Sequence, residues 1–255
     1  MDIEKIIQEA VSQVLSQTSM PNASTSTQYD PSYGQYMDHT VLKPETTKET
    51  VKRFCNEAIE YKFASVCINP TQVTYVASLL KDTGVKTCCV IGFPLGATTS
   101  FVKGVETMEA VKNGAEEVDM VINIGALKDK NYTLVYEDIK SVVDNAHPNA
   151  IVKVIIETSA LTDEEKVIAC ELAKRAGTDF VKTSTGMGTG GATIEDVRLM
   201  KRTVGENIRV KASTGINDRE ITDAFLAAGA VRMGTSKGML IVKGEKPSEE
   251  QKKVY

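Results

Sequence analysis

Residues 179–193 read DFVKTSTGMGTGGAT, and this stretch contains one complete transition from strand to helix. The apolar run 179–184 predicts a buried β-strand, the glycine-rich part predicts a turn, and Thr193 is a residue type that caps helix N-termini. A segment with helical periodicity follows over 193–203. A strand, a loop and a helix in this order form the βα unit of parallel α/β proteins.

The βα unit recurs along the chain. Short apolar runs predict eight strands, at 36–41, 65–69, 86–93, 117–123, 152–158, 179–184, 208–213 and 230–235. Helical spacing of apolar residues predicts helices at 46–60, 71–81, 99–113, 131–145, 163–175, 193–203 and 217–228. Eight parallel strands with outer helices favour an α/β fold of the TIM (β/α)8 barrel type, with an open, doubly wound sheet as the structural alternative.

Both ends of the chain depart from this repeated βα pattern. Apolar residues at helical spacing predict an amphipathic helix within the first 15 residues, and residues 18–35 are rich in Ser, Thr, Asn, Gly and Pro. We therefore expect an extra N-terminal helix and a polar linker over 1–35, a catalytic barrel domain over 36–241, and a polar C-terminal tail over 242–255.

The composition of the 255 residues narrows the classes of function. The formal net charge of -4 argues against binding to nucleic acid or to an anionic membrane surface. The sequence lacks an apolar run of the roughly 20 residues that a membrane helix needs, and its start does not resemble a signal peptide, so we expect a cytoplasmic protein. Five cysteines without regular spacing predict neither a disulfide framework nor a zinc site.

Charged residues share faces of several predicted strands. Asp119 in EVDMVIN, Lys182 in FVKTS and Lys211 in RVKAS each lie two residues from another polar residue, so each pair shares one face of its strand. Lys153 and Glu157 in KVIIE share a face in the same way and extend the group. We expect these side chains to point into the barrel, towards the carboxyl ends of the strands, where barrel active sites lie.

Two structural explanations compete with a catalytic one. The lysines could form an ion-pair network with Asp119, Glu117 and Glu157, or the register could turn them outward into solvent. Charges inside a barrel are costly to desolvate unless they are paired, and function is the usual reason for keeping several there. Both explanations remain open at this point.

Two lysines and a carboxylate suit imine catalysis. A lysine nucleophile has a reference pKa of about 10.4, which must fall by roughly three units for the amine to be mostly free at neutral pH. One like charge at about 4 Å supplies the necessary free energy of about 4 kcal/mol, so Lys211 beside Lys182 is sufficient. Because a close carboxylate would oppose the shift, we expect Asp119 to act through a water or a substrate hydroxyl.

These residues lie in motifs that resemble the deoxyribose-phosphate aldolase family along nearly all of residues 36–241. The matching stretches occur in the family's order: MDHTVLKP, SVCINP, VIGFPLGATT, EVDMVINIGALK, KVIIETSALT, DFVKTSTGMGTGGAT and VRMGTSKG. The resemblance implies a TIM barrel and reversible cleavage of 2-deoxy-D-ribose 5-phosphate to acetaldehyde and D-glyceraldehyde 3-phosphate. It also implies that neither a metal nor an organic cofactor is needed.

The resemblance implies roles for individual residues. Lys182 matches the Schiff-base lysine, Lys211 the lysine that perturbs it, and Asp119 the carboxylate that transfers protons. Further matches imply substrate-binding positions, namely Asp38, Thr40, Cys67, Lys153, Thr183, Gly186, Ser213, Gly215, Gly234, Ser236 and Lys237. Taken without the resemblance, Asp38 is equally a polar strand end, Cys67 a packing residue, and 186–191 a flexible glycine loop.

The chain departs from the family after the seventh predicted strand. Residues 211–217 read KASTGIN where family members commonly read KASGGIR, so Thr214 and Asn217 replace a glycine and an arginine. A β-branched residue restricts a turn that glycine allows, and the lost arginine removes a charge for the phosphate. Lys237 offers partial compensation, and we therefore expect weaker selectivity against unphosphorylated aldehydes.

The C-terminal residue, the type of reaction and the oligomeric state each leave more than one interpretation. The terminal Tyr255 matches a tyrosine that ends some family members, which implies a helper in proton transfer, although terminal residues are commonly disordered. The rival functions are another lysine-dependent aldolase with a keto donor, and a catalytically silent sugar-phosphate-binding protein. The expected partners are small sugar phosphates and aldehydes, together with further copies of the chain in a homodimer or homotetramer.

Overall fold

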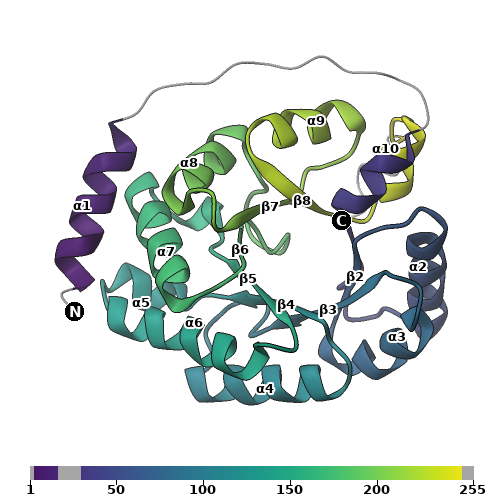
Figure 1. Ribbon diagram of the computed structural model, residues 1–255, viewed down its shortest axis with the longest axis horizontal. Coiled ribbons are helices and arrows are strands. Elements are labelled where there is room, and N and C mark those ends of the chain that lie inside the picture. Colours follow the sequence, from purple (N-terminus) through teal and green to yellow (C-terminus); the bar gives the residue numbers. More distant parts are fainter. Residues whose placement is uncertain (1–2, 17–29, 249–255) are drawn as a thin grey trace.

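The computed structural model describes residues 3–16 and 30–248, and its centre is a closed ring of eight parallel strands (Figure 1). The strands are β1 (Met37–Thr40), β2 (Ser65–Ile68), β3 (Lys86–Ile91), β4 (Glu117–Val121), β5 (Ile151–Ile155), β6 (Phe180–Lys182), β7 (Arg209–Ser213) and β8 (Ala230–Thr235). Each strand pairs with the next along the chain, and β8 pairs with β1. The predicted barrel is confirmed, and the doubly wound alternative is wrong.

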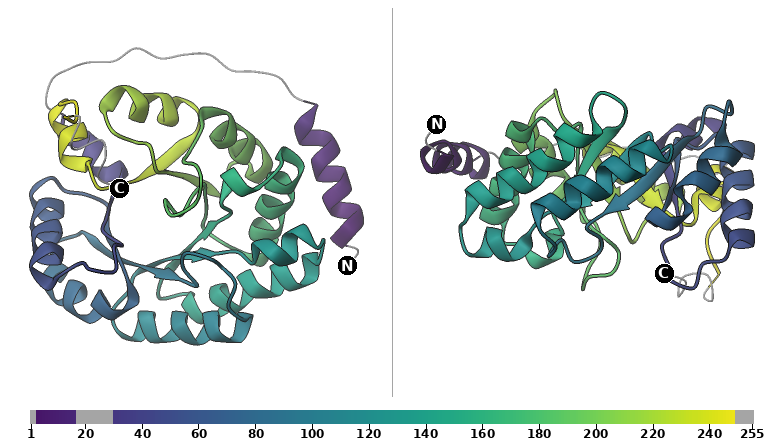
Figure 2. Two further views of the ribbon diagram at one scale, coloured as in Figure 1. Left: turned by 180° about the vertical axis from the view of Figure 1, so that it is seen from behind. Right: turned by 90° about the horizontal axis from the view of Figure 1, so that it is seen from below.

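Helices surround the ring on its outside, as the views from behind and from below show (Figure 2). They are α2 (Lys48–Glu60), α3 (Val73–Leu80), α4 (Ser100–Lys112), α5 (Ile124–Lys128), α6 (Tyr132–Ala146), α7 (Asp163–Ala176), α8 (Ile194–Val204), α9 (Arg219–Ala227) and α10 (Gly238–Lys243). Three short 3-10 helices accompany them: Pro31–Tyr36, Pro70–Gln72 and Thr158–Ala160. The sequence patterns did not predict α5 or α10, because six residues or fewer cannot establish a period.

Side-chain caps fix where the βα units turn into helices. Thr47, Thr99 and Thr193 accept hydrogen bonds from backbone N–H groups in the first turn of α2, α4 and α8. Thr162 and Glu165 form a reciprocal capping box at the start of α7. Each cap satisfies backbone donors that a helix leaves unpaired, so the loops above the strands end at defined positions.

The predicted N-terminal helix is present as α1 (Ile3–Leu15) and packs on the outside of the barrel. Its Val14 contacts Val167 of α7 and Leu199 of α8, and Ile7 joins the main apolar core. Figure 1 shows α1 beside these two helices. The division of the chain at residues 35 and 241 stays a prediction.

Strand residues alternate between two environments. Val118, Met120, Val154 and Val210 point outward and pack in the apolar core beneath the helices. Their neighbours along the strands point inward, and most of these are charged. This alternation confirms the predicted register and excludes the outward-facing one for the lysines. Among the described residues, no helix is long and apolar enough to cross a membrane.

Candidate active site

Seven charged side chains fill the centre of the barrel, and we call them the barrel cluster. Each is at most 9% exposed, and the group comprises three carboxylates and four basic side chains: Asp38, Glu117, Asp119, Lys153, Lys182, Lys211 and Arg232. They belong to β1, β4, β5, β6, β7 and β8. Because these strands span most of the chain, the closed ring is what brings the seven together.

Asp119 lies at the centre of this cluster. Its Oδ2 accepts hydrogen bonds from Nζ of Lys182 at 2.8 Å and from Nζ of Lys211 at 2.7 Å. Its Oδ1 accepts from Nζ of Lys153 at 2.8 Å and from the thiol of Cys88 at 3.2 Å. Asp119 therefore contacts Lys182 directly, and its expected transfer of protons through a water or a substrate hydroxyl stays a prediction.

A second carboxylate layer joins the barrel's first and last strands. Asp38 accepts from Nε of Arg232 at 2.9 Å and from Oγ of Ser65 at 2.6 Å, and its other oxygen lies 2.5 Å from Nζ of Lys211. Glu117 pairs with Arg232 at 2.7 Å and with Lys153 at 2.5 Å. Asp38 does not line the cavity, and its role in substrate binding stays a prediction.

Burial and charge act in opposite directions on these groups. Burial alone raises the pKa of Asp38 and Asp119, but the neighbouring cations outweigh it and hold both pKa values below their usual range. Burial alone lowers the pKa of Lys153 and Lys211, but the carboxylates outweigh it and raise both pKa values. Burial also disfavours the charged form of Arg232, but Asp38 and Glu117 outweigh it and raise the pKa of Arg232. These five groups are therefore held in their charged forms.

Lys182 is the surplus base of the barrel cluster. The carboxylates of Asp38, Glu117 and Asp119 equal in number the cations Lys153, Lys211 and Arg232. The fourth basic side chain, Lys182, has no fourth carboxylate in the cluster to match it. A neutral amine still donates one N–H to Asp119 and keeps a lone pair for an electrophile.

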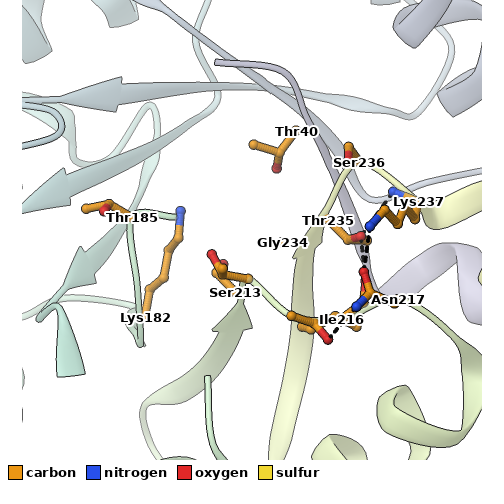
Figure 3. Close-up of a pocket in the computed structure, with 12 residues that line it drawn as sticks. Thr40, Lys182, Thr185, Ser213, Ile216, Asn217, Gly234, Thr235, Ser236 and Lys237 are labelled. Carbon is orange, nitrogen blue, oxygen red and sulfur yellow. Dashed lines mark hydrogen bonds between the residues drawn. The ribbon is translucent and has the colours of Figure 1, made fainter. Parts of the chain in front are cut away.

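A cavity lies directly above Lys182, and Lys182 is the member of the barrel cluster that lines it (Figure 3). The lining residues come from the ends of β1, β6, β7 and β8 and the loops after them: Thr40, Lys182, Thr185, Ser213, Thr214, Gly215, Ile216, Asn217, Gly234, Thr235, Ser236 and Lys237. The nitrogen thus faces a cavity at the carboxyl ends of the strands, as an imine-forming lysine requires.

The end of the cavity away from Lys182 is formed by the two loops that the sequence singles out for phosphate. Nζ of Lys237 donates to Oδ1 of Asn217 at 2.7 Å, and burial lowers the pKa of Lys237. Thr214 has a φ of 73°, a left-handed conformation that is strained for a β-branched residue. Thr214 and Asn217 therefore both line the cavity, and Thr214 has a φ that glycine adopts freely.

Other predicted binding residues lie beside or below the cavity. Thr183 is buried, and its hydroxyl oxygen accepts from the backbone N–H of Ser213 at 3.1 Å, so it supports a residue of the lining. Gly186 has a φ of 83° and turns the chain into the glycine loop. Lys153 lies in the barrel cluster, on the far side of Asp119 from Lys182.

Cys67 does not line the cavity. It packs with Cys88, Leu42 and Val90 inside the barrel, and a hydrogen bond with Cys88 lowers the pKa of the Cys67 thiol. Ligand atoms of Cys67, Cys88 and Asp119 lie within 4.8 Å of one another. Three lysine amines already surround this carboxylate, however, so their positive charge opposes a cation there.

The prediction that Glu157 extends the barrel cluster is wrong. β5 ends at Ile155, and Glu157 adopts a left-handed conformation with a φ of 57°. Strand alternation no longer applies beyond the end of the strand, and the side chain turns towards the backbone and hydroxyl of Thr185.

The sequence patterns missed Arg232 and Thr185. Arg232 precedes Gly234 by two residues on β8, so the alternation that places Gly234 at the pocket also turns Arg232 inward. Thr185 lines the cavity three residues after Lys182, beyond the end of β6, where no alternation locates it. A signal was therefore available for Arg232 and absent for Thr185.

Comparison with known proteins adds an independent line of evidence. A deoxyribose-phosphate aldolase from Clostridium tetani is 61% identical over 212 residues, which cover 83% of this chain and 98% of the relative. One from Halalkalibacterium halodurans is 60% identical and covers 84% of this chain and 96% of its own length.

Solved structures agree with the sequence relatives. The structure of a tetrameric deoxyribose phosphate aldolase from Aeropyrum pernix superposes with a TM-score of 0.78 at 30% identity, covering 92% of this chain and 96% of that one. The family model of the DeoC/LacD family aldolases matches residues 33–243, which include every strand of the barrel and the whole barrel cluster. The chain therefore belongs to the DeoC/LacD aldolase family.

Proposed function

We propose that this chain is a class I aldolase that reversibly cleaves 2-deoxy-D-ribose 5-phosphate to D-glyceraldehyde 3-phosphate and acetaldehyde through a Schiff base on Lys182. The observation that carries the proposal is the charge balance of the barrel cluster, in which three carboxylates match three cations and Lys182 is the fourth basic group. The relatives with about 60% identity carry the name of this activity.

The cluster supplies the groups for each step. The amine of Lys182 attacks the aldehyde carbon, and loss of water leaves an iminium whose positive charge withdraws electrons from the bond to be broken. Asp119, 2.8 Å from this nitrogen, accepts the proton of the substrate's 3-hydroxyl through a water as the carbon–carbon bond breaks. Protonation of the resulting enamine and hydrolysis return acetaldehyde and the free amine.

Lys211 has a different task. Its amine and that of Lys182 bind the same oxygen of Asp119, so a fixed positive charge lies close to the nucleophile. The carboxylates of Asp119 and Asp38 keep Lys211 charged by outweighing its burial. Lys211 thereby places a fixed positive charge beside the amine that attacks the aldehyde.

The 5-phosphate belongs at the other end of the cavity. Lys237 supplies a positive charge there, and Gly215 and Gly234 leave room for a close approach of the anion. Asn217 offers an uncharged amide where an arginine is common, and it shares the amine of Lys237. The preference for 2-deoxyribose 5-phosphate over 2-deoxyribose is therefore reduced.

Borohydride trapping tests the function directly. Acetaldehyde and borohydride should add a two-carbon group to Lys182, identified by mass mapping of peptides, and Lys182→Ala should lose both the adduct and the cleavage of the sugar phosphate. Lys166→Ala removes a lysine that pairs with Asp196 outside the barrel and should retain both. A wild-type protein that cleaves the sugar phosphate without an adduct at Lys182 would refute the mechanism.

The same experiment separates the rival functions. An aldolase with a keto donor gives an adduct with pyruvate or dihydroxyacetone phosphate in preference to acetaldehyde, and a sugar-phosphate-binding protein gives none. Neither rival has a specific feature of the site in its favour.

We also propose a cytoplasmic enzyme that acts on small sugar phosphates and aldehydes and not on nucleic acid or membranes, as its net charge of -4 supports. A homodimer or homotetramer is proposed because one relative is tetrameric, and light scattering measures the mass. A helper role for Tyr255 stays a prediction, because Tyr255 lies outside the described residues. Its deletion should slow turnover, and an unchanged rate would exclude the role.

A further inference from the structure

Glu157 is a buried acidic residue that the proposed mechanism does not use. It is 6% exposed and follows β5 in a left-handed conformation, with a φ of 57°. Among the described non-glycine residues with positive φ, Lys62, Asp82 and Lys130 are exposed on the surface, whereas Glu157 and Thr214 lie at the site. Backbone strain of this kind persists where surrounding contacts impose it, and it concentrates at functional sites.

The carboxylate of Glu157 determines the orientation of a hydroxyl in the pocket. Its Oε2 accepts from the backbone N–H of Thr185 at 3.2 Å, and it also accepts the hydroxyl proton of Thr185 in a short hydrogen bond. The hydroxyl oxygen in turn accepts from the backbone N–H of Met187 at 3.0 Å. A threonine hydroxyl has one proton and two lone pairs, so a single lone pair remains.

This remaining lone pair belongs to a residue of the cavity wall. Thr185 lines the cavity together with Lys182, and Figure 3 shows the two on the side opposite Asn217 and Lys237. Because its proton is committed to a carboxylate, Thr185 Oγ1 can only accept from a ligand. The charge of the carboxylate also makes this oxygen a stronger acceptor.

The second oxygen of Glu157 is held against the glycine loop. Oε1 is buried and has no hydrogen-bond partner in the described part of the chain. A Cβ atom at Gly188 would lie 3.2 Å from Oε1 and 3.1 Å from the carboxyl carbon. A Cβ atom at either of two neighbouring glycines would also be too close to its surroundings, at Gly190 to Ser159 and at Gly191 to the carbonyl of Thr214. The loop and the carboxylate are therefore packed together.

We propose that Glu157 is a positioning residue that holds the Thr185 hydroxyl as an obligatory hydrogen-bond acceptor for a hydroxyl group of the substrate. The inference rests on the proposed function and adds a requirement to it: the substrate must present an O–H donor between the imine carbon and the phosphate. Acetaldehyde, which has no hydroxyl, makes no use of this contact.

Glu157→Gln tests the inference with little change of shape. The glutamine oxygen takes the place of Oε2, because it accepts from the backbone N–H and the hydroxyl of Thr185, so the variant removes only the charge behind the hydroxyl. The kcat/KM for 2-deoxyribose 5-phosphate should fall by about 3- to 10-fold, because a hydrogen bond without charge assistance is weaker. The rate of borohydride trapping with acetaldehyde should stay at the wild-type value.

A double-mutant cycle shows whether Glu157 acts through Thr185. Thr185→Val removes the acceptor itself and should cause at least as large a loss, and combining it with Glu157→Gln should add little to that loss. Glu171→Gln and Thr178→Val are matched controls, because both residues are buried outside the site, and both should keep wild-type efficiency.

The outcomes separate this inference from the proposed function. A wild-type protein without trapping or cleavage refutes the proposed function itself. Wild-type efficiency in Glu157→Gln, an equal loss of trapping and cleavage, or additive losses in the cycle would each overturn the role of Glu157. If Glu157→Gln does not fold, as thermal unfolding shows, Thr185→Val alone decides, and wild-type efficiency in that variant overturns the inference.

Discussion

Replacement of Lys211 by leucine removes the fixed positive charge next to Lys182. The two amines hydrogen-bond the same oxygen of Asp119, at 2.8 Å and 2.7 Å. Their nitrogens are therefore at most 5.5 Å apart, and two unit charges at that distance repel by about 3 kcal/mol at an effective dielectric of about 20. Without Lys211, the three carboxylates of the cluster exceed the two remaining fixed cations.

The expected result is a shift of the pH profile. A free energy of about 3 kcal/mol corresponds to about two pH units, so the pH at which kcat/KM reaches half its maximum should rise by that amount. At neutral pH the variant should be about 100-fold slower, and much of the activity should return in alkaline buffer. The assay follows release of acetaldehyde by its NADH-dependent reduction.

A matched control separates the charge effect from general damage. Lys166→Leu removes a lysine of α7 that bonds Asp196 at 2.7 Å outside the barrel, and its pH profile should match the wild type. A loss of the same size at every pH in Lys211→Leu, or a profile that does not move, would refute the reasoning. Lys211 would then act by shape and not by charge.

Three further predictions concern the phosphate end, the backbone and the ionic centre. Lys237→Ala should lower kcat/KM for the 5-phosphate by about 10-fold and leave 2-deoxyribose unaffected, because its charge faces the phosphate alone; equal losses on both substrates would contradict this. Thr214→Gly relieves the left-handed strain at φ 73°, so urea titration should show about 1 kcal/mol of added stability, and a destabilised variant would contradict the strain. Asp38 and Asp119 have folded pKa values below their unfolded ones, so they stabilise the fold above pH of about 4 and lose this effect as pH falls. Urea titrations at successive pH values should therefore show a loss of up to about 1.4 kcal/mol per group and pH unit, and constant stability down to pH of about 3 would contradict it.

Local patterns in the sequence were sufficient for the fold and for the direction of the catalytic side chains. Alternation along a strand is a property of the extended backbone, so spacing alone shows which residues share a strand face with Asp119, Lys182 and Lys211. The inward direction of these faces was an expectation that the closed barrel confirms. The capping threonines and glycine turns between the strands likewise act within a few residues. The family motifs over residues 36–241 include Lys182, and the family model matches residues 33–243.

Tertiary structure alone decided which of these charges meet and which of them is left over. Arg232 and Asp38 are 194 residues apart in the chain and come into contact because β8 closes on β1. Closure of the barrel thus adds Arg232 to Lys153 and Lys211 as the third fixed cation. Without Arg232, the three carboxylates would match all of the lysines and Lys182 would not be the surplus base. Spacing along a strand carries no information about contacts across the ring, and it carries none about Glu157, where the strand has already ended.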